Sequence, residues 1–239
     1  MKKDLKAEGA LTVLLKDAFN PNIVQTLEHN LAIIHGGPFA NIAHGCNSVV
    51  ATRMALKLGD YVVTEAGFGA DLGAEKFVDI KCRKTGLNPA CAVCVATLKA
   101  LKYHGGATVD ECKEENEKAL EVGIENLLRH VENIKNVLGM NVVVAINKFP
   151  TDTDREIEFL SNKLKEVGVE LSLSEVWAKG GEGALDLAEK VMALAEKERQ
   201  ITPIYELSDS LKIKIEKVAK NLYGAEGVEY SEEAENELA

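Results

Sequence analysis

The segment 35–48 concentrates residues that could do chemistry within one short loop, His-Gly-Gly-Pro-Phe-Ala-Asn-Ile-Ala-His-Gly-Cys-Asn-Ser. Its paired glycines let the backbone approach a ligand closely, and its His and Asn side chains supply hydrogen-bonding groups. His35 and His44 are candidate proton-transfer residues, because neutral imidazole suits acid–base catalysis near pH 7. The alternative is a tight turn in which either histidine serves as a polar cap.

A second glycine-rich loop follows the apolar run 61–64. It contains Glu65, Gly67, Phe68 and Gly69, but its spacing is not that of a dinucleotide-binding motif. An acid at a strand end, followed by glycine-rich backbone, is typical of nucleotide hydrolases that sense the terminal phosphate and its magnesium. The alternative is a glycine-rich turn with an exposed phenylalanine.

Two further loops each contain an aromatic residue beside polar groups. Asn147, Lys148 and Phe149 follow the apolar run 141–147; Asn can bond the edge of a ring and the Lys stem can pack on its face. Trp177, the single tryptophan, precedes a lysine and three glycines in the segment 174–183. Two aromatics at one sheet edge could enclose a flat heterocycle.

Cys91 and Cys94 form a C-x-x-C pair, which raises zinc and redox chemistry. Zinc would need two more ligands, and the chain has neither a second C-x-x-C nor an H-x-x-x-H. The surrounding apolar run 90–96 predicts a buried strand in which Cys packs as a small apolar residue. We therefore expect no metal site here. The chain has five cysteines, and an odd number in an acidic chain without a signal peptide indicates reduced thiols in the cytoplasm.

The elements that must position these loops alternate along the chain. Short apolar runs at 61–64, 91–97, 141–147 and 169–176 predict strands buried on both faces. Apolar residues at helical spacing predict helices over 48–57, 110–138, 152–167, 184–200 and 208–223. Thr151 or Asp152 would cap the third of these helices, and Gly224 would end the last. The alternation predicts an α/β fold with a mostly parallel sheet and flanking helices, with ligands at the carboxyl ends of the strands.

Composition excludes several classes of protein. The chain has 239 residues, 46% hydrophobic residues and a net charge of −10, which disfavours both disorder and nonspecific nucleic-acid binding. No run approaches the ~20 apolar residues of a membrane span, and residues 1–5 do not look like a signal peptide. Six glutamates fall in the segment 224–239, which we expect to be a solvated, partly frayed end.

These segments resemble the formate–tetrahydrofolate ligase family, also called 10-formyltetrahydrofolate synthetases. The matching stretches are distributed along nearly the whole chain and are 5–10, 21–26, 35–48, 61–77, 147–153, 174–183 and 223–224. The resemblance implies ATP-dependent ligation of formate to tetrahydrofolate through formyl phosphate, with ATP, its magnesium and tetrahydrofolate as substrates and no tightly bound cofactor. It also implies the later part of a P-loop NTPase-like domain.

The resemblance also implies roles for the loop residues. Phe149 and Trp177 look like the pair that stacks the pterin. The adenine-side wall would comprise Asn147, Lys148, Leu173 and Ser174. Phe68 and its flanking glycines would lie near formyl phosphate, with Glu65, His35 and His44 as further catalytic candidates.

The sequence departs from the family in one respect: it contains no phosphate-gripping G-x-x-x-x-G-K-[ST] motif. We therefore expect a truncated chain that is inactive alone, because the missing Lys and its cradle stabilise phosphoryl transfer. The alternatives are a non-catalytic subunit of a split enzyme, which binds folate or nucleotide with the missing portion as partner, and a structural fragment that self-associates through a sheet edge. The chain divides into a His/Gly/Asn-loop segment (1–58), an α/β ligand-binding portion (59–202), and a C-terminal helix with its acidic tail (203–239).

Overall fold

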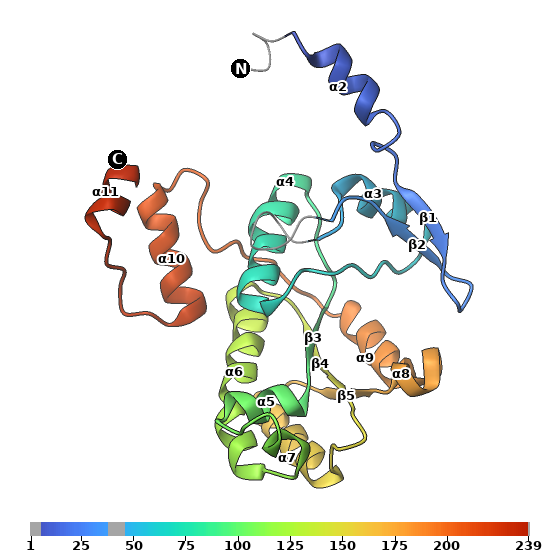
Figure 1. Cartoon of the computed structure of the whole chain (residues 1–239), viewed down its shortest axis with the longest axis vertical. Helices are drawn as coiled ribbons and strands as arrows, with labels where there is room; N and C mark the ends of the chain where they lie inside the picture. Colours follow the sequence, from blue (N-terminus) through green and yellow to red (C-terminus); the bar gives the residue numbers. More distant parts are fainter. Residues whose placement is uncertain (1–5, 38–45, 239) are drawn as a thin grey trace.

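A computed structural model describes residues 6–37 and 46–238. Its centre is a three-stranded parallel sheet in the order β3-β4-β5, formed by β3 (Ala92–Ala96), β4 (Val142–Asn147) and β5 (Leu171–Ser174) (Figure 1). Three of the four predicted strands are thereby confirmed, and so is the α/β class. The central strand β4 is buried from Val142 to Ile146, as expected for a strand covered on both faces.

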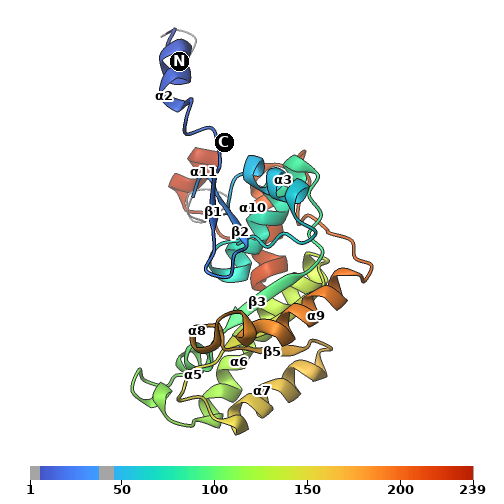
Figure 2. The same ribbon diagram turned by 90° about the vertical axis from the view of Figure 1, so that its right-hand side faces the viewer.

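The main hydrophobic core lies on one face of this sheet, under α5 (Leu98–His104), α6 (Glu117–Glu132) and α7 (Asp154–Glu166). Helix α9 (Leu185–Ala195) contacts β4 and β5, and Figure 2 shows it on the other side of the strands from α6. On β3, Cys94 is buried, whereas Val93 and Val95 are 40% and 60% exposed. The second face of the sheet is therefore covered over β4 and β5 and open over β3.

Helices α5 and α6 approach each other closely because glycines lie at their contact. A Cβ at Gly105 would lie 1.7 Å from the carbonyl oxygen of Ala119, and one at Gly123 would lie 1.8 Å from that of Leu101. Any larger side chain would have to push the two backbones apart.

The predicted helices form, with changes at their ends. The 110–138 pattern is divided into a 3-10 turn (Glu111–Lys113), α6, and a π-helical turn (Asn133–Val137). Helix α7 is capped by Thr153, with a reciprocal bond from Glu156, and not by Thr151 or Asp152 as predicted. A capping box needs Glu three residues after the cap, and only Thr153 has that spacing.

The predicted strand at 61–64 is wrong. These residues belong to no helix or strand and pair with no described strand, and Tyr61 and Val63 are 60% and 92% exposed. The run is short, and the sequence of a short apolar run does not show whether another strand pairs with it. The chain then enters a helix over residues 69–85, named here the 69–85 helix. It is built from two π-helical segments (Gly69–Ala74 and Phe77–Cys82) and α4 (Arg83–Thr85).

The N-terminal part is separate from this sheet. Helix α2 (Glu8–Leu15) has no buried residue and projects from the rest of the chain (Figures 1 and 2). Strands β1 (Asn22–Gln25) and β2 (Leu31–Ile34) form an antiparallel hairpin, which is followed by α3 (Val49–Leu58).

The C-terminal part contains α10 (Leu211–Tyr223) and α11 (Glu232–Leu238). Gly224 ends α10 in the left-handed conformation, as predicted. The acidic tail is mostly exposed, only its end (α11) is helical, and Lys212 pairs with Glu235 across α10 and α11. Within the described residues, no helix combines the length and apolar character that crossing a membrane requires.

Candidate functional site

The ends of β4 and β5 bring together four of the residues selected from the sequence. Asn147 and Ser174 are register partners on the two strands, and the backbone N–H of Lys148 donates to the Ser174 carbonyl at 3.1 Å. Asn147 is exposed, Lys148 and Leu173 are half-buried and Ser174 is buried. Residues from two distant parts of the sequence therefore form one continuous surface at the carboxyl edge of the sheet.

Phe149 is held at this edge by the turn that leads into α7. Its N–H donates to Oδ2 of Asp152 at 2.8 Å, and its carbonyl accepts from the Asp152 N–H at 3.0 Å. The Phe149 side chain is 47% exposed while Asp152 is buried. Burial raises the pKa of Asp152, and the bond from the Phe149 N–H opposes that rise. The turn thus fixes the backbone of an aromatic residue whose ring remains accessible.

Trp177 lies in the short helix α8 (Val176–Lys179) and is 94% exposed. Glu175 begins this turn: its carbonyl accepts from the Ala178 and Lys179 amides, and its carboxylate pairs with Lys179 at 2.6 Å. The bond from Lys179 lowers the pKa of Glu175. An apolar ring this exposed contributes little to packing, so the indole is free to contact a ligand.

The hairpin brings one residue to this edge that the sequence did not indicate. Glu28, in the turn between β1 and β2, accepts from the Gly181 N–H at 2.5 Å. A Cβ at Gly181 would lie 2.2 Å from the Glu28 carboxylate, so a larger residue there would displace the Glu28 side chain. The only sequence signal was the glycine cluster itself, which does not specify a partner 153 residues away.

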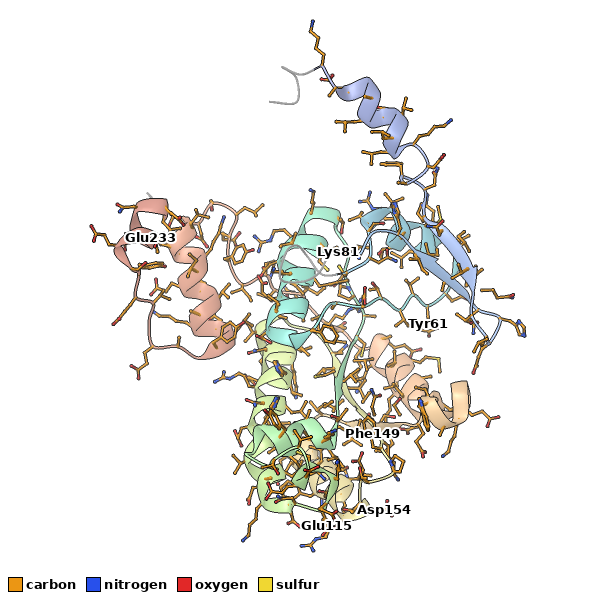
Figure 3. The ribbon with its side chains drawn as sticks, viewed as in Figure 1. Tyr61, Lys81, Glu115, Phe149, Asp154 and Glu233 are labelled. Atoms are coloured by element: carbon orange, nitrogen blue, oxygen red, sulfur yellow. The ribbon has the colours of Figure 1, made fainter. Side chains whose placement is uncertain are left out.

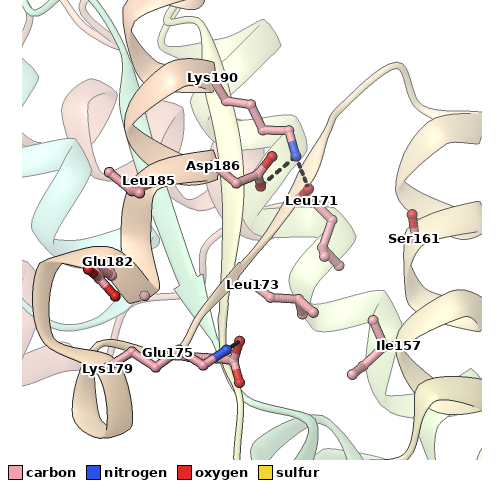
Figure 4. A pocket seen from close by; sticks show the side chains of 11 residues that line it. Ile157, Ser161, Leu171, Leu173, Glu175, Lys179, Glu182, Leu185, Asp186 and Lys190 are labelled. Carbon is pink, nitrogen blue, oxygen red and sulfur yellow. Dashed lines mark hydrogen bonds and ion pairs between the residues drawn. The ribbon is translucent and has the colours of Figure 1, made fainter.

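A cavity of about 420 Å³ lies beside these loops, between α7, β5 and α9. Its apolar lining includes Ile157, Leu171 and Leu173, as Figure 4 shows. At its rim, Lys190 bonds the Leu171 carbonyl at 2.9 Å and the Asp186 carboxylate at 2.7 Å. Leu173 is the one predicted site residue that lines this cavity; Phe149 and Trp177 lie outside its lining.

The 65–69 loop lies at the other end of the sheet. Phe68 is 95% exposed, and Gly67 and Gly69 have φ of +81° and +70°. The helix that follows contacts the last turn of α6, where Asp71 is 3.8 Å from His130, and this is the end at which β4 begins. Figure 1 shows the 69–85 helix at the upper end of the sheet and α5 and α7 at the lower end. The loop therefore does not follow a strand of the sheet, contrary to the prediction, and it is not gathered with Phe149.

His35 makes structural contacts through both ring nitrogens. Its Nδ1 lies 2.7 Å from Ser48 Oγ, and its Nε2 lies 2.9 Å from the carbonyl oxygen of Ala18. A carbonyl only accepts, so Nε2 carries a proton and Nδ1 accepts from the serine hydroxyl when the ring is neutral. Ser48 in turn caps α3 by accepting from the Ala51 N–H at 3.0 Å. These contacts fit the capping alternative; His44 lies outside the described residues.

The cysteines are buried or partly buried. Cys94 is in β3, and burial raises the pKa of its thiol to about 11; burial also raises that of Cys91. No disulfide joins any two of the five cysteines, all of which lie within the described residues. Among residues 6–37 and 46–238, no three His, Cys, Asp or Glu residues form a group that could hold a metal ion. The packing interpretation of Cys94 is supported.

Comparison with models of known protein families gives a match to the family described as formate–tetrahydrofolate ligase, over residues 1–239. The match spans every residue of the chain, including both aromatic loops at the carboxyl edge of the sheet. This chain therefore belongs to the formate–tetrahydrofolate ligase family.

Proposed function

We propose that this chain supplies the pterin- and purine-binding surface of an ATP-dependent formate–tetrahydrofolate ligase. The family joins formate to tetrahydrofolate with ATP. The observation that carries the proposal is the bond between the Lys148 N–H and the Ser174 carbonyl, which joins the two aromatic loops at one sheet edge.

In this proposal the two exposed aromatics stack on the pterin. Phe149 and Trp177 present rings that the rest of the protein leaves accessible, and stacking recovers the apolar contact that they lack. Asn147, Lys148, Leu173 and Ser174 form the wall on the adenine side. Asn147 is suited to bond a ring edge, and the Leu173 side chain offers apolar contact.

The reaction would proceed in two steps. A formate oxygen attacks the terminal phosphorus of ATP, the bond to the bridging oxygen breaks, and ADP leaves. The N10 amine of tetrahydrofolate then attacks the formyl carbon, phosphate leaves, and the amine proton is lost to a base. Magnesium would accompany the ATP, held mainly by the phosphate oxygens and by water.

For the 65–69 loop we propose contact with formyl phosphate by Glu65, Gly67, Phe68 and Gly69. Support comes from the exposure of Phe68 and the left-handed glycines beside it. This loop is distant from Phe149 in the fold, so its role needs its own test. In an enzyme completed with the phosphate-gripping portion, Phe68→Ala should impair the formate-dependent step and leave tetrahydrofolate binding unchanged.

We further propose that these 239 residues alone do not complete the reaction, because they contain no G-x-x-x-x-G-K-[ST] motif. The three-stranded sheet would be the later part of a P-loop NTPase-like domain, acting in the cytoplasm and divided at residues 58 and 202. The alternative is a non-catalytic folate- or nucleotide-binding subunit that a separate phosphate-gripping chain completes. A structural fragment that self-associates is a further alternative, favoured by the open face of β3, where Val95 is 60% exposed.

Fluorescence separates these proposals, because Trp177 is the only tryptophan. Tetrahydrofolate should quench it saturably, after correction for absorbance with free tryptophan amide. Phe149→Ala should weaken the quenching, while Phe19→Ala, an exposed aromatic in the N-terminal segment, should not. No quenching of a chain shown to be folded by circular dichroism would contradict the proposed function. Ligase activity of the purified chain with ATP, formate and tetrahydrofolate would contradict the proposal that these residues are inactive by themselves.

A further inference from the structure

A fully buried ion pair lies beneath the loop that carries Phe149. The Nζ of Lys102, on α5, is 3.0 Å from Oε1 of Glu156, on α7, and both side chains are 0% exposed. Charged side chains are almost never buried this completely unless they are paired. An ion pair of this kind is weak evidence of stabilisation, because desolvation offsets the attraction. Stabilisation of the fold therefore does not explain why two charged side chains are buried beneath this loop.

The pair is also hydrogen-bonded to the segment that leads into α6. The Lys102 ammonium also donates to the carbonyl of Glu114 at 2.9 Å. Oε1 of Glu156 accepts from the Asn116 N–H at 3.0 Å, and the Asn116 side chain caps α6. The pair therefore fixes α5, the entry to α6 and the start of α7 relative to one another.

Glu156 also reaches the loop directly. Its Oε2 accepts from both the N–H and the hydroxyl of Thr153 at 3.3 Å. The neighbouring Asp152 holds the Phe149 N–H, and the charge of Lys102 acts on Asp152. A continuous chain of contacts thus runs from the buried ammonium to the backbone of Phe149.

We infer that Lys102 and Glu156 are positioning residues that hold the 149–153 loop, and with it the Phe149 ring, in the orientation needed for ligand binding. The identity of the ligand rests on the proposed function. The positioning of the loop by the buried pair does not. Neither residue touches the accessible surface at this edge, so each acts through Thr153, Asp152 and the backbone of the loop.

The chain offers a matched control on the same elements. Arg155, the second residue of α7, pairs with Glu117, the first residue of α6, at 2.7 Å, but this pair is exposed. Figure 3 shows that Phe149, Asp154 and Glu115 lie at the same end of the molecule. Both ion pairs therefore join the start of α7 to a neighbouring helix near the 149–153 loop. The exposed pair has no bond to the 149–153 loop in the described residues.

The test uses the double variant Lys102→Met/Glu156→Gln, which removes both buried charges together and keeps an acceptor for the Asn116 N–H. Amide hydrogen exchange is measured for residues 149–153 by mass spectrometry. We expect exchange there to accelerate roughly tenfold, the effect of losing the loop's supporting hydrogen bonds. Binding of tetrahydrofolate should weaken about 10- to 100-fold, as when outer supporting groups are removed. Arg155→Gln/Glu117→Gln should change neither.

Unchanged exchange at 149–153 in the folded double variant would overturn the inference. Accelerated exchange with unchanged tetrahydrofolate binding would overturn its functional part. Accelerated exchange in a protein whose wild type binds no tetrahydrofolate would leave the positioning role standing and contradict the proposed function instead. If the double variant does not fold, Thr153→Ala decides: it removes one link of the chain at a half-buried site. The inference then stands only if Thr153→Ala accelerates loop exchange and Thr108→Ala, at the separate turn with Glu111, does not.

Discussion

Lys148 and Ser174 are joined by a single backbone hydrogen bond of 3.1 Å, at the point where β4 and β5 end. Parallel strands place their carboxyl ends at one edge, and this bond extends the pairing one residue beyond Asn147 on β4. The loops that follow therefore leave the sheet side by side. An aromatic residue on each loop becomes part of the same surface.

Replacing Phe149 or Trp177 by alanine should weaken ligand binding without affecting the fold. Both rings are exposed, at 47% and 94%, so each change should alter the free energy of unfolding by less than about 0.5 kcal/mol. Loss of one stacking contact should cost about 0.5–1.5 kcal/mol of tetrahydrofolate binding, up to about tenfold. Calorimetric titration measures this for both variants, with Phe19→Ala as control. A variant that binds as well as the wild type would exclude its residue from the stacking pair.

Glu75 should make the folded state less stable as pH rises. It is 8% exposed in the 69–85 helix, and burial, with the neighbouring Asp79 charge, raises its pKa from 4.5 to about 7. Below pH 4.5 the carboxyl is neutral in both states. Between 4.5 and 7 only the folded state retains the proton, so stability falls as pH rises through this window, by up to about 3 kcal/mol.

The variant Glu75→Gln isolates this contribution. The amide imitates the protonated acid, so it should raise the melting temperature at pH 8 and change it little at pH 5. Glu121→Gln, an exposed change on α6, should have no such dependence. Thermal melts at the two pH values give the comparison, and an equal effect of Glu75→Gln at both would show that the buried charge is not the cause.

We expect the main role of His35 to be stabilisation of the fold. Its ring joins Ser48, the cap of α3, to the carbonyl of Ala18. His35→Ala should therefore lower the free energy of unfolding by about 1–2 kcal/mol, through two lost hydrogen bonds. Urea unfolding measures the change, and His104→Ala, an exposed histidine at the end of α5, is the control. A fully stable His35→Ala protein with a lost chemical step in the completed enzyme would instead favour proton transfer.

Gly123→Ala should be among the most destabilising small changes in the chain. Its new methyl would lie 1.8 Å from the Leu101 carbonyl oxygen, so α5 and α6 would have to separate, at a cost of about 3 kcal/mol or more. Gly227→Ala is the matched control, because nothing lies within 4 Å of its Cβ position. Denaturant midpoints compare the two variants, and similar values would show that the helices accommodate the methyl group.

Local sequence rules predicted much of the scaffold. Continuous apolar runs identified β3, β4 and β5, because a strand buried on both faces needs apolar residues at successive positions. Gly224 marked the end of a helix, because capping depends on residues within one turn. The glycine and aromatic loops at the ends of β4 and β5 were found for the same reason: each is a local pattern.

The same rules failed where the answer depended on distant partners. Residues 61–64 have a strand-like pattern, but a strand needs a neighbouring backbone to accept and donate its hydrogen bonds. The 69–85 helix was missed because Gly69 and Gly73 oppose helix formation by propensity. Tertiary contact explains Gly73: a Cβ there would lie 2.0 Å from the Ala66 carbonyl oxygen.

The sequence by itself therefore determined the class of the fold, the family and the two aromatic loops. The strand pattern also predicted that Phe149 and Trp177 lie at one sheet edge. Only the tertiary structure placed the Phe68 loop at the opposite end of the sheet, brought Glu28 to Gly181, and buried Lys102 against Glu156. The physical reason is range: periodicity and caps act within a few residues, whereas strand pairing and a buried charge pair are set by groups tens of residues apart.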